Sequence, residues 1–363
     1  MIQAKDEPEL LKLMMRDSAS APNPYRTTNY WAVKEKVLVP EIEKNGLKDF
    51  RQRYKSYLIS FGAADAPMSL GKIQLYDSPF WNSKFFRKIP FWSRVLAAGN
   101  IFLNKISPKF LPIHSEIRVA EIQKLFYDFT CLYGILQGAK PLSAISDSLV
   151  GNPADAFPIE GKSYTLGLLS HYMRYAYLCK YIDFGSIKLL VELGAGSGRQ
   201  TEVLKKLHPE ICYFVFDIPP QLYVCEQYLK AIFPDDVVSY AQTRTMESLV
   251  PEKGKIYILG NWKFPVIKNM DVDLFWNSAS FQEMEPDVVA NYLQYVNASS
   301  RNVYLREQMD GQVRAIREGL KGVLEPTVLK HYQIGLSKFD MIAMSPTLYP
   351  TGASDSFWRR KDG

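Results

Sequence analysis

The sequence predicts an α/β protein with a mainly parallel sheet flanked by helices, preceded by a mostly helical amino-terminal region. From residue 187 onward, short apolar runs alternate with segments of helical spacing, the pattern of a doubly wound sheet. The first run ends in glycines, as a buried parallel strand that leads into a helix does. Helical spacing dominates before that point. We therefore expect a helical region over residues 1–145 and an α/β domain over residues 146–363.

The composition is that of a globular chain with a sizeable core. The 363 residues are 47% hydrophobic and 23% charged, which excludes a disordered, collagen-like or disulfide-framework protein. No apolar run approaches the roughly 18 residues of a membrane-spanning helix, and Asp6, Glu7 and Pro8 stand where a signal peptide needs apolar residues. We expect a cytoplasmic protein. The four cysteines form no Cys-x-x-Cys pair, so neither zinc nor any other metal is indicated.

The amino-terminal elements are mainly helical. Apolar residues from His114 to Leu136 recur at alternating steps of three and four, which predicts one apolar helix face. Residues Ser143–Thr165 are rich in turn formers and predict a connection. Leu166–Tyr181, rich in tyrosine, predicts another helix.

The elements of the sheet follow in alternation. The predicted strands are Ile187–Leu193, Cys212–Asp217, Val237–Tyr240, Ile256–Leu259, Asp273–Asn277 and Asn302–Arg306. The predicted helices between them are Arg199–His208, Pro219–Phe233 and Pro286–Val296. Tyr332–Leu336 and Met341–Met344 are candidates for terminal strands.

A glycine-rich turn, Gly194-Ala195-Gly196-Ser197-Gly198, lies between the first predicted strand and its helix. Ligands of open α/β sheets bind outside the carboxyl ends of the strands, where glycines let a ligand approach the backbone. A dinucleotide fingerprint has its third glycine three residues after the second. Here that position is Arg199, so a diphosphate ligand is disfavoured.

Two carboxylates indicate a different ligand. Glu192 lies two residues before Gly194, and Asp217 ends the second predicted strand, where a carboxylate can accept hydrogen bonds from both ribose hydroxyls. In the alternative, Glu192 is a buried acid that caps backbone amides and Asp217 caps the following helix. The turn and the two acids favour a nucleoside cofactor.

Together these residues resemble the class I S-adenosylmethionine-dependent methyltransferases, whose fold is Rossmann-like. The resemblance implies that Glu192, Gly194, Ala195, Gly196 and Gly198 surround the amino-acid end of S-adenosyl-L-methionine and that Asp217 holds the ribose. A sulfonium cation suits such a site, because it carries no phosphate that needs anion-binding donors.

A closer resemblance is to a sugar O-methyltransferase family, over roughly residues 146–310. It is carried by Gly151-Asn152-Pro153, the glycine turn, Asp217-Ile218-Pro219 and the run Asn277-Ser278-Ala279-Ser280-Phe281-Gln282-Glu283-Met284. It implies methyl transfer to a sugar hydroxyl and leaves the acceptor itself undefined.

The run after Asn277 lies at the sheet edge where an acceptor must meet the methyl group. Methyl transfer is an in-line displacement, and a positioned base helps by accepting the proton of the hydroxyl. Glu283 is the first candidate for this base, with Ser280 and Gln282 as orienting groups. In the alternative, Asn277 and Ser280 only satisfy backbone groups at the strand end and Glu283 faces solvent.

The remaining candidates are less specific. His171, on the helix before the first strand, is a rival base. Ile218 could lie against the adenine ring, Gln242 and Thr243 could meet its edge, and Asn277 is included among the cofactor-binding residues. Ordinary polar loop residues are the alternative for Gln242 and Thr243.

Residues 78–113 form a basic and aromatic stretch without a single acid. It carries Lys84, Arg87, Lys88, Arg94, Lys105 and Lys109 among eight phenylalanines and tryptophans. Peripheral contact with an anionic membrane, which would suit a lipid-linked sugar acceptor, is one interpretation. A phosphorylated substrate is another, and an aromatic core with solvated lysines is a third. Nucleic acid is the least favoured partner, since residues 1–150 have a net charge of +7 and the rest −1.

The sequence therefore predicts a methyltransferase that uses S-adenosyl-L-methionine and acts on a hydroxyl of a sugar or glycoconjugate. Two alternatives remain: a small-molecule methyltransferase for a non-sugar alcohol or amine, and a cofactor-binding protein without turnover. The oligomeric state is not indicated.

Overall fold

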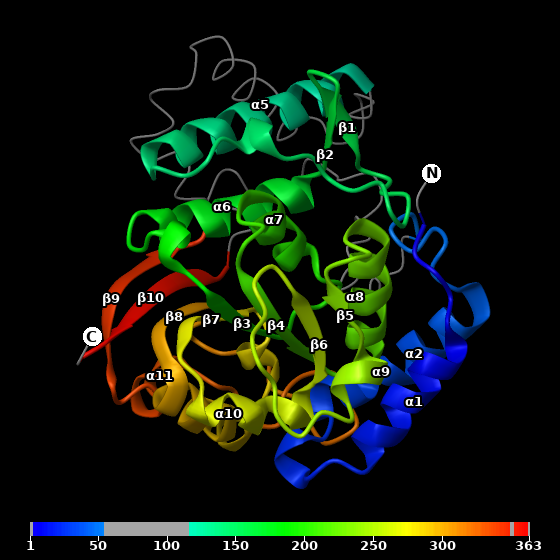
Figure 1. Cartoon of the computed structure of the whole chain (residues 1–363), viewed down its shortest axis with the longest axis vertical. Helices are drawn as coiled ribbons and strands as arrows, with labels where there is room; N and C mark the ends of the chain where they lie inside the picture. Colours follow the sequence, from blue (N-terminus) through cyan, green and yellow to red (C-terminus); the bar gives the residue numbers. More distant parts are fainter. Residues whose placement is uncertain (1–2, 54–115, 349–351, 362–363) are drawn as a thin grey trace.

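A computed structural model describes residues 3–53, 116–348 and 352–361 of the chain. Its centre is an eight-stranded sheet of order β5-β6-β4-β3-β7-β8-β10-β9 (Figure 1). The strands from β5 to β8 are parallel, whereas β10 and β9 are antiparallel. The predicted α/β class with a mainly parallel sheet is confirmed. Its strands are β3 (Leu189–Leu193), β4 (Cys212–Asp217), β5 (Val237–Val238), β6 (Ile256–Gly260), β7 (Val272–Ser278), β8 (Ser300–Glu307), β9 (Phe339–Pro346) and β10 (Ser354–Arg360).

Both faces of the sheet are covered by helical elements. In the described part of the chain, the α-helices are α1 (Pro8–Ala19), α2 (Asn29–Asn45), α5 (Glu116–Leu136), α6 (Leu166–Cys179), α7 (Arg199–Leu207), α8 (Pro219–Ile232), α9 (Tyr240–Thr243), α10 (Pro286–Ser299) and α11 (Leu329–Gly335). Two 3₁₀ segments also matter below, η7 (Asn261–Asn269) and η8 (Phe281–Glu283).

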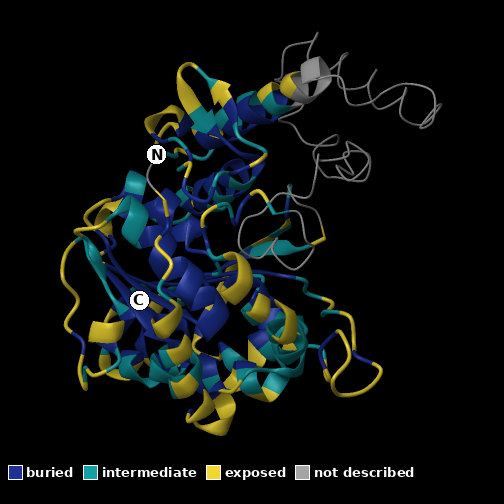
Figure 2. Ribbon diagram, turned by 90° about the vertical axis from the view of Figure 1, so that its right-hand side faces the viewer, coloured by how far each residue is buried: buried dark blue, intermediate teal, exposed yellow. Residues whose placement is uncertain are grey.

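Alternate residues of each strand enter two separate cores, because side chains of a strand point to opposite faces. Leu190 and Tyr213 face α6, α7 and α8, whereas Val191 and Phe214 face η7, α10 and α11. Helix α5 lies on α6 as a further layer (Figure 1). Figure 2 shows buried residues through the middle of the molecule and exposed residues along the outer helix surfaces.

The amino-terminal helices share a core with the sheet. Leu10, Leu11 and Met14 of α1 and Leu38 of α2 are buried in the same cluster as the residues of α6 and α8. Helix α1 packs against α8. The segment before residue 54 is thus part of the surroundings of the sheet, while the boundary between residues 145 and 146 stays a prediction.

Four local expectations need correction or addition. Tyr332–Leu336 is not a strand but part of α11: Tyr332 and Leu336 are buried four residues apart while Ile334 is 64% exposed, which is helical spacing. Val237–Tyr240 is a strand only over its first two residues, because Ser239 and Gln242 form a capping box that starts α9 at Tyr240.

The sequence pattern does not predict strand β10 (Ser354–Arg360). The connection Ser143–Thr165 contains a hairpin of β1 (Phe157–Ile159) and β2 (Lys162–Tyr164), whose turn residues Glu160 and Gly161 both have positive φ.

No helix in the described part of the chain is long and apolar enough to cross a membrane. The basic and aromatic stretch of residues 78–113 lies outside the described residues, so its predicted membrane contact stays a prediction.

Candidate functional site

The turn 194–198 requires its glycines. Gly194, Gly196 and Gly198 have φ values of 79°, 60° and 79°, in the left-handed region that other residues avoid. A β-carbon on Gly194 would lie 2.2 Å from the Cβ of Ser280, and one on Gly198 would lie 2.9 Å from the Sγ of Cys225. The turn is therefore closely packed against the segment after β7 on one side and against α8 on the other.

Asp217 joins this turn to the neighbouring strand. Its Oδ2 accepts a hydrogen bond from the backbone N–H of Gly196 and its Oδ1 accepts one from that of Ile218, both at 2.7 Å. Burial raises the pKa of Asp217 to about 7; the two amides act against this rise, and nearby Glu283 and Glu192 add to it. The structure thus brings together the glycine turn and the acid that the sequence indicated. Asp217 does not cap α8, whose N-cap is Ile218.

Glu192 lies on β3 beneath the turn. Its Oε2 accepts a hydrogen bond from the hydroxyl of Thr201 at 2.6 Å, and burial raises its pKa to about 7. In the described part of the chain, its hydrogen-bond partner is thus a side-chain hydroxyl on α7 and not a backbone amide. Ala195 is buried in the turn itself.

Glu283, in η8, is held by the start of α2. The indole Nε1–H of Trp31 donates to its Oε2 at 2.9 Å, and the Nζ of Lys34 lies 3.8 Å from its Oε1. Its backbone carbonyl accepts a hydrogen bond from Thr28. The side chain is 15% exposed, so it does not simply face solvent. Burial raises the pKa of Glu283, while Lys34, Tyr30 and Trp31 lower it.

The segment between β7 and η8 is fixed by buried side chains. Asn277 donates from Nδ2 to the carbonyl of Leu193 at 2.9 Å, and its Oδ1 accepts from the N–H of Phe281 at 3.0 Å. Asn277 is fully buried, and these bonds connect β7 to the end of β3. The side-chain Oε1 of Gln282 accepts a hydrogen bond from the backbone N–H of Gln308 at 2.7 Å. Ser280 lies against Gly194.

Glu307 is a site residue that the sequence interpretation missed. Its Oε1 accepts a hydrogen bond from the backbone N–H of Ala279 at 3.1 Å, and its Oε2 accepts one from the backbone N–H of Gln282 at 3.0 Å. Burial raises its pKa to about 8. A usable signal existed, since Glu307 follows a predicted strand directly, as Asp217 ends another. Trp31 and Lys34 were also missed, and no local pattern marks them.

The other predicted residues lie around this centre. His171, on α6, has its Nδ1 3.1 Å from both Oε1 of Gln200 and Nη1 of Arg174, and burial lowers its pKa well below the usual value. Gln242 accepts hydrogen bonds from the N–H and hydroxyl of Ser239. Thr243 is buried and donates to backbone carbonyls of α9 and β6. The side chains of Gln242 and Thr243 thus serve the α9 turn, and their predicted roles at adenine stay predictions, as does that of Ile218.

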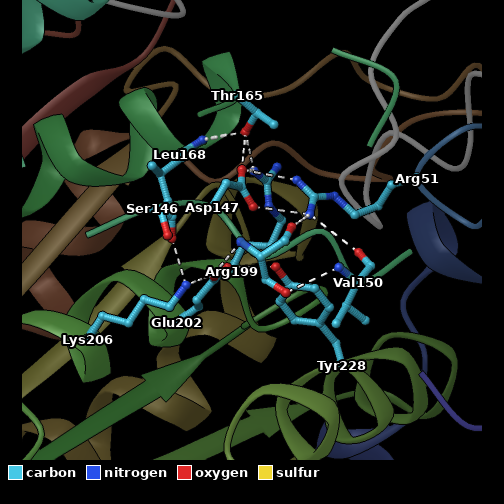
Figure 3. Close-up of polar contacts among 11 residues, drawn as sticks. Arg51, Ser146, Asp147, Val150, Thr165, Leu168, Arg199, Glu202, Lys206 and Tyr228 are labelled. Carbon is cyan, nitrogen blue, oxygen red and sulfur yellow. Dashed lines mark hydrogen bonds and ion pairs between the residues drawn. The ribbon is translucent and has the colours of Figure 1, made fainter. Parts of the chain in front are cut away.

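Arg199 has a structural role that explains why it can replace a third glycine. Asp147 lies between Arg51 and Arg199, with hydrogen bonds of 3.1 Å and 3.0 Å (Figure 3). Arg199 also donates to Thr165, the N-cap of α6, at 2.8 Å. Next to this group, Glu202 accepts hydrogen bonds from Tyr228 and Lys206. The helix that follows the glycine turn is thereby tied to the start of α6.

Two cavities in the described part of the chain lie away from the predicted site residues. A groove of about 990 Å³ lies at the amino ends of β3, β4 and β7, lined by Lys188, Cys212 and Asp273 among others. A second, of about 490 Å³, is lined by residues near the end of α6. Within residues 3–53, 116–348 and 352–361, no group of three His, Cys, Asp or Glu side chains is placed to hold a metal ion.

Comparison with known proteins gives structural likenesses only. No protein-family model matches the sequence, and no curated protein matches it. The pyocyanin biosynthetic protein PhzM is 12% identical over 53% of this chain and 57% of its own, with a TM-score of 0.37. NcsB1 is an O-methyltransferase from neocarzinostatin biosynthesis, solved with S-adenosyl-L-homocysteine and 1,4-dihydroxy-2-naphthoic acid. It is 13% identical over 54% of this chain and 56% of its own, with a TM-score of 0.37. The N-terminal domain of EvdMO1, solved with S-adenosyl-L-homocysteine, is 15% identical over 57% of this chain and 91% of its own, with a TM-score of 0.37. The matched part spans less than two thirds of the PhzM and NcsB1 chains, and scores this low identify no function.

Proposed function

We propose that this chain is an S-adenosyl-L-methionine-dependent O-methyltransferase whose acceptor is a hydroxyl of a sugar or glycoconjugate. The observation that carries the proposal is the hydrogen bond from Gly196 to Asp217. It joins the glycine turn after β3 to the carboxylate at the end of β4, and a nucleoside with an amino-acid tail needs both at one sheet edge. The sugar acceptor rests on the motif resemblance alone.

The residues at this edge fit such a cofactor. Each carboxylate oxygen of Asp217 accepts one amide N–H and keeps a further lone pair, which can accept a ribose hydroxyl. Position 194 requires glycine, because a side chain there would collide with Ser280. Asp217 would hold the ribose, the turn 194–198 the amino-acid end, and Ile218 the adenine ring. When bound, the cofactor supplies an electrophilic methyl group on a sulfonium centre.

The chain itself supplies proton acceptance and alignment. Glu283 accepts the proton of the attacking hydroxyl, a task that contributes about 10²-fold to 10⁴-fold to a rate. Trp31 and Lys34 hold its carboxylate in one orientation and favour its ionised form against burial. Ser280, which lies against Gly194 and comes three residues before Glu283, orients the acceptor. Asn277 and Glu307 keep this segment rigid, so that the oxygen, methyl carbon and sulfur can stay in line.

Two experiments test the proposal. Calorimetry with S-adenosyl-L-homocysteine is expected to show binding, and absence of any heat overturns the proposal. Incubation of a cell glycan extract with isotope-labelled S-adenosyl-L-methionine is expected to label a carbohydrate fraction. Label in a non-sugar alcohol or amine would identify the second candidate, a small-molecule methyltransferase, and binding without transfer would identify a cofactor-binding protein without turnover.

The base is tested separately. Glu283→Gln is expected to slow transfer by about 10²-fold or more and to leave the affinity for S-adenosyl-L-homocysteine unchanged. Glu325→Gln, at an exposed carboxylate, is the control. Full turnover in Glu283→Gln would assign the proton to another group, with His171 as the next candidate.

A further inference from the structure

The loop that follows β8, residues 311–325, exposes several large apolar side chains close together. Ile316 is 94% exposed and Val313 73%, and Leu320 and Leu324 are exposed as well. Single exposed apolar residues are normal on a protein surface, whereas a group of them marks a surface that meets another molecule. The loop therefore calls for a partner.

The backbone of the loop is fixed by its own hydrogen bonds. The N–H of Ala315 donates to the carbonyl of Val323 at 2.7 Å, and the N–H of Val323 donates to the carbonyl of Val313 at 3.1 Å. The two arms of the loop are close, since a β-carbon on Gly322 would lie 2.6 Å from the carbonyl oxygen of Val313. Ala315 and Val323 are buried. The loop thus has an inner side that packs on the protein and an outer side that carries the exposed group.

Asn29, the first residue of α2, binds the tip of the loop. Its Nδ2 donates to the carbonyls of Leu320 and Gly322 at 3.0 and 2.8 Å, and its Oδ1 accepts a hydrogen bond from the N–H of Gly319 at 2.7 Å. The same start of α2 holds the carboxylate of Glu283. The loop and the proposed base therefore share one support, at the edge of the sheet where β8 ends.

Basic side chains accompany the exposed apolar ones. Residues 311–324 contain three basic residues and a single acid, Glu318. Three of the exposed apolar residues are each followed directly by an exposed basic one, in the pairs Val313-Arg314, Ile316-Arg317 and Leu320-Lys321. The outer side of the loop is therefore both apolar and positively charged.

This combination fits the surface of an anionic membrane. Apolar side chains enter the boundary between headgroups and acyl chains, while arginine and lysine are attracted to anionic lipids. A second copy of the chain fits less well, because a two-fold contact of the loop with itself would bring like charges together. The positive charge thus favours the membrane as the partner.

We propose that the loop of residues 311–325 docks on an anionic membrane, with its exposed apolar side chains inserted and its three basic side chains against lipid phosphates. This surface is separate from the basic stretch of residues 78–113. Lipid binding by the loop does not depend on the proposed function. If that function also holds, the bilayer lies beside Glu283, at the edge where a lipid-linked acceptor could reach the site.

Sedimentation with vesicles tests the proposal. The full chain is expected to sediment with vesicles of phosphatidylglycerol and phosphatidylcholine in equal amounts, and much less with phosphatidylcholine alone. Ile316→Asp is expected to weaken binding about tenfold or more. Val250→Asp is the matched control, because Val250 is 73% exposed and lies before the amino end of β6, at the opposite edge of the sheet. The double variant Arg317→Gln, Lys321→Gln is expected to weaken binding about tenfold and to reduce its dependence on salt.

A fluorescence measurement locates the contact directly. Ile316→Trp places an indole at the exposed position of the loop, and brominated lipid in the vesicles is expected to quench this added fluorescence. Val250→Trp is expected to show no added quenching. Both positions are exposed, so these variants are expected to fold, and thermal unfolding checks that they do. Equal quenching in the two variants overturns the proposal.

The other outcomes also decide the proposal. Absence of vesicle binding by the unmodified protein overturns it. Equal binding by Ile316→Asp and the unmodified protein would place the lipid contact elsewhere, for example in residues 78–113, and overturns it too. Dimerisation that Ile316→Asp abolishes, without vesicle binding, would assign the loop to a second copy of the chain. Vesicle binding is measured without cofactor, so a failure of S-adenosyl-L-homocysteine to bind would refute the proposed function and leave this proposal intact.

Discussion

The indole Nε1–H of Trp31 donates to Oε2 of Glu283 at 2.9 Å, although 252 residues separate the two in the sequence. The contact places the start of α2 on the segment after β7, beside the end of β4. An amino-terminal helix thus contributes directly to the surroundings of the proposed base. Its ionisation depends on this contact, because the hydrogen bond stabilises the carboxylate against a burial that favours the acid.

The first prediction concerns this bond. Trp31→Phe removes the N–H donor and keeps an aromatic ring, so the pKa of Glu283 is expected to rise further. A base must be ionised to accept a proton, and the acidic limb of the pH profile of methyl transfer is therefore expected to move to higher pH. The affinity for S-adenosyl-L-homocysteine is expected to stay the same. Trp358→Phe, which loses an indole hydrogen bond to Ser356 on β10 and not one to Glu283, is the control. An acidic limb that does not move contradicts the prediction.

The second prediction concerns Asp217 and pH. Its pKa of about 7 means that the ionised form, which accepts ribose hydroxyls, predominates only above that value. The dissociation constant of S-adenosyl-L-homocysteine is expected to rise about tenfold for each pH unit below 7. Calorimetry between pH 5.5 and 8 measures it. Asp217→Asn is expected to bind more weakly and with little dependence on pH, whereas the exposed-site variant Asp235→Asn should behave as the unmodified protein. A flat pH dependence of the unmodified protein would show that Asp217 does not govern binding.

The third prediction concerns Asp147, which forms ion pairs with two buried arginines, Arg51 and Arg199. Burial raises the pKa of Asp147, but Arg51 and Arg199 outweigh it and lower the value to about 2. Asp147→Asn leaves two buried guanidinium groups without their anion and is expected to lower the free energy of unfolding by about 3 kcal/mol or more. Urea denaturation measures this loss. Asp271→Asn, which removes an exposed ion pair with Arg301, is expected to cost less than about 1 kcal/mol.

The sign of the pH effect at Asp147 follows from the lowered pKa. The stabilisation is complete above the ordinary value of 3.8 and is lost as the pH falls toward about 2. The free energy of unfolding of the Asn variant is therefore expected to fall less steeply over this range. Parallel pH curves for the two proteins would contradict this assignment.

The sheet and the glycine turn could be predicted because their signals are local. A short apolar run followed by glycines indicates a buried strand wherever the rest of the chain lies, and parallel strands present their carboxyl ends at one edge, so Asp217 was expected beside the turn. Glu307 could have been found by the same reasoning.

The rest could not be predicted because it depends on long-range packing. Nothing near Trp31 or Glu283 indicates that they meet, since the hydrogen bond joins residues 252 positions apart. Strand β10, Ser-Asp-Ser-Phe-Trp-Arg-Arg, lacks the apolar alternation of a strand and is stabilised by its neighbours β8 and β9. The catalytic and cofactor-binding roles of the site residues stay predictions.

The last prediction concerns Ala279, which connects β7 to η8 with a φ of 62°. This left-handed conformation costs a residue with a β-carbon about 1–2 kcal/mol. The amide of Ala279 donates to the carbonyl of Arg306 at 2.7 Å and to Oε1 of Glu307 at 3.1 Å, and these bonds hold the strained turn. Ala279→Gly relieves the strain but makes the unfolded chain more flexible, so the free energy of unfolding is expected to rise by about 0.5 kcal/mol. Ala290→Gly, at an exposed position within α10, is expected to lower it by about 1 kcal/mol. Urea denaturation of the two variants is expected to give opposite signs. Equal losses would mean that the turn stores no strain, and that the position of Ser280 and Glu283 is set by Glu307 and Asn277 alone.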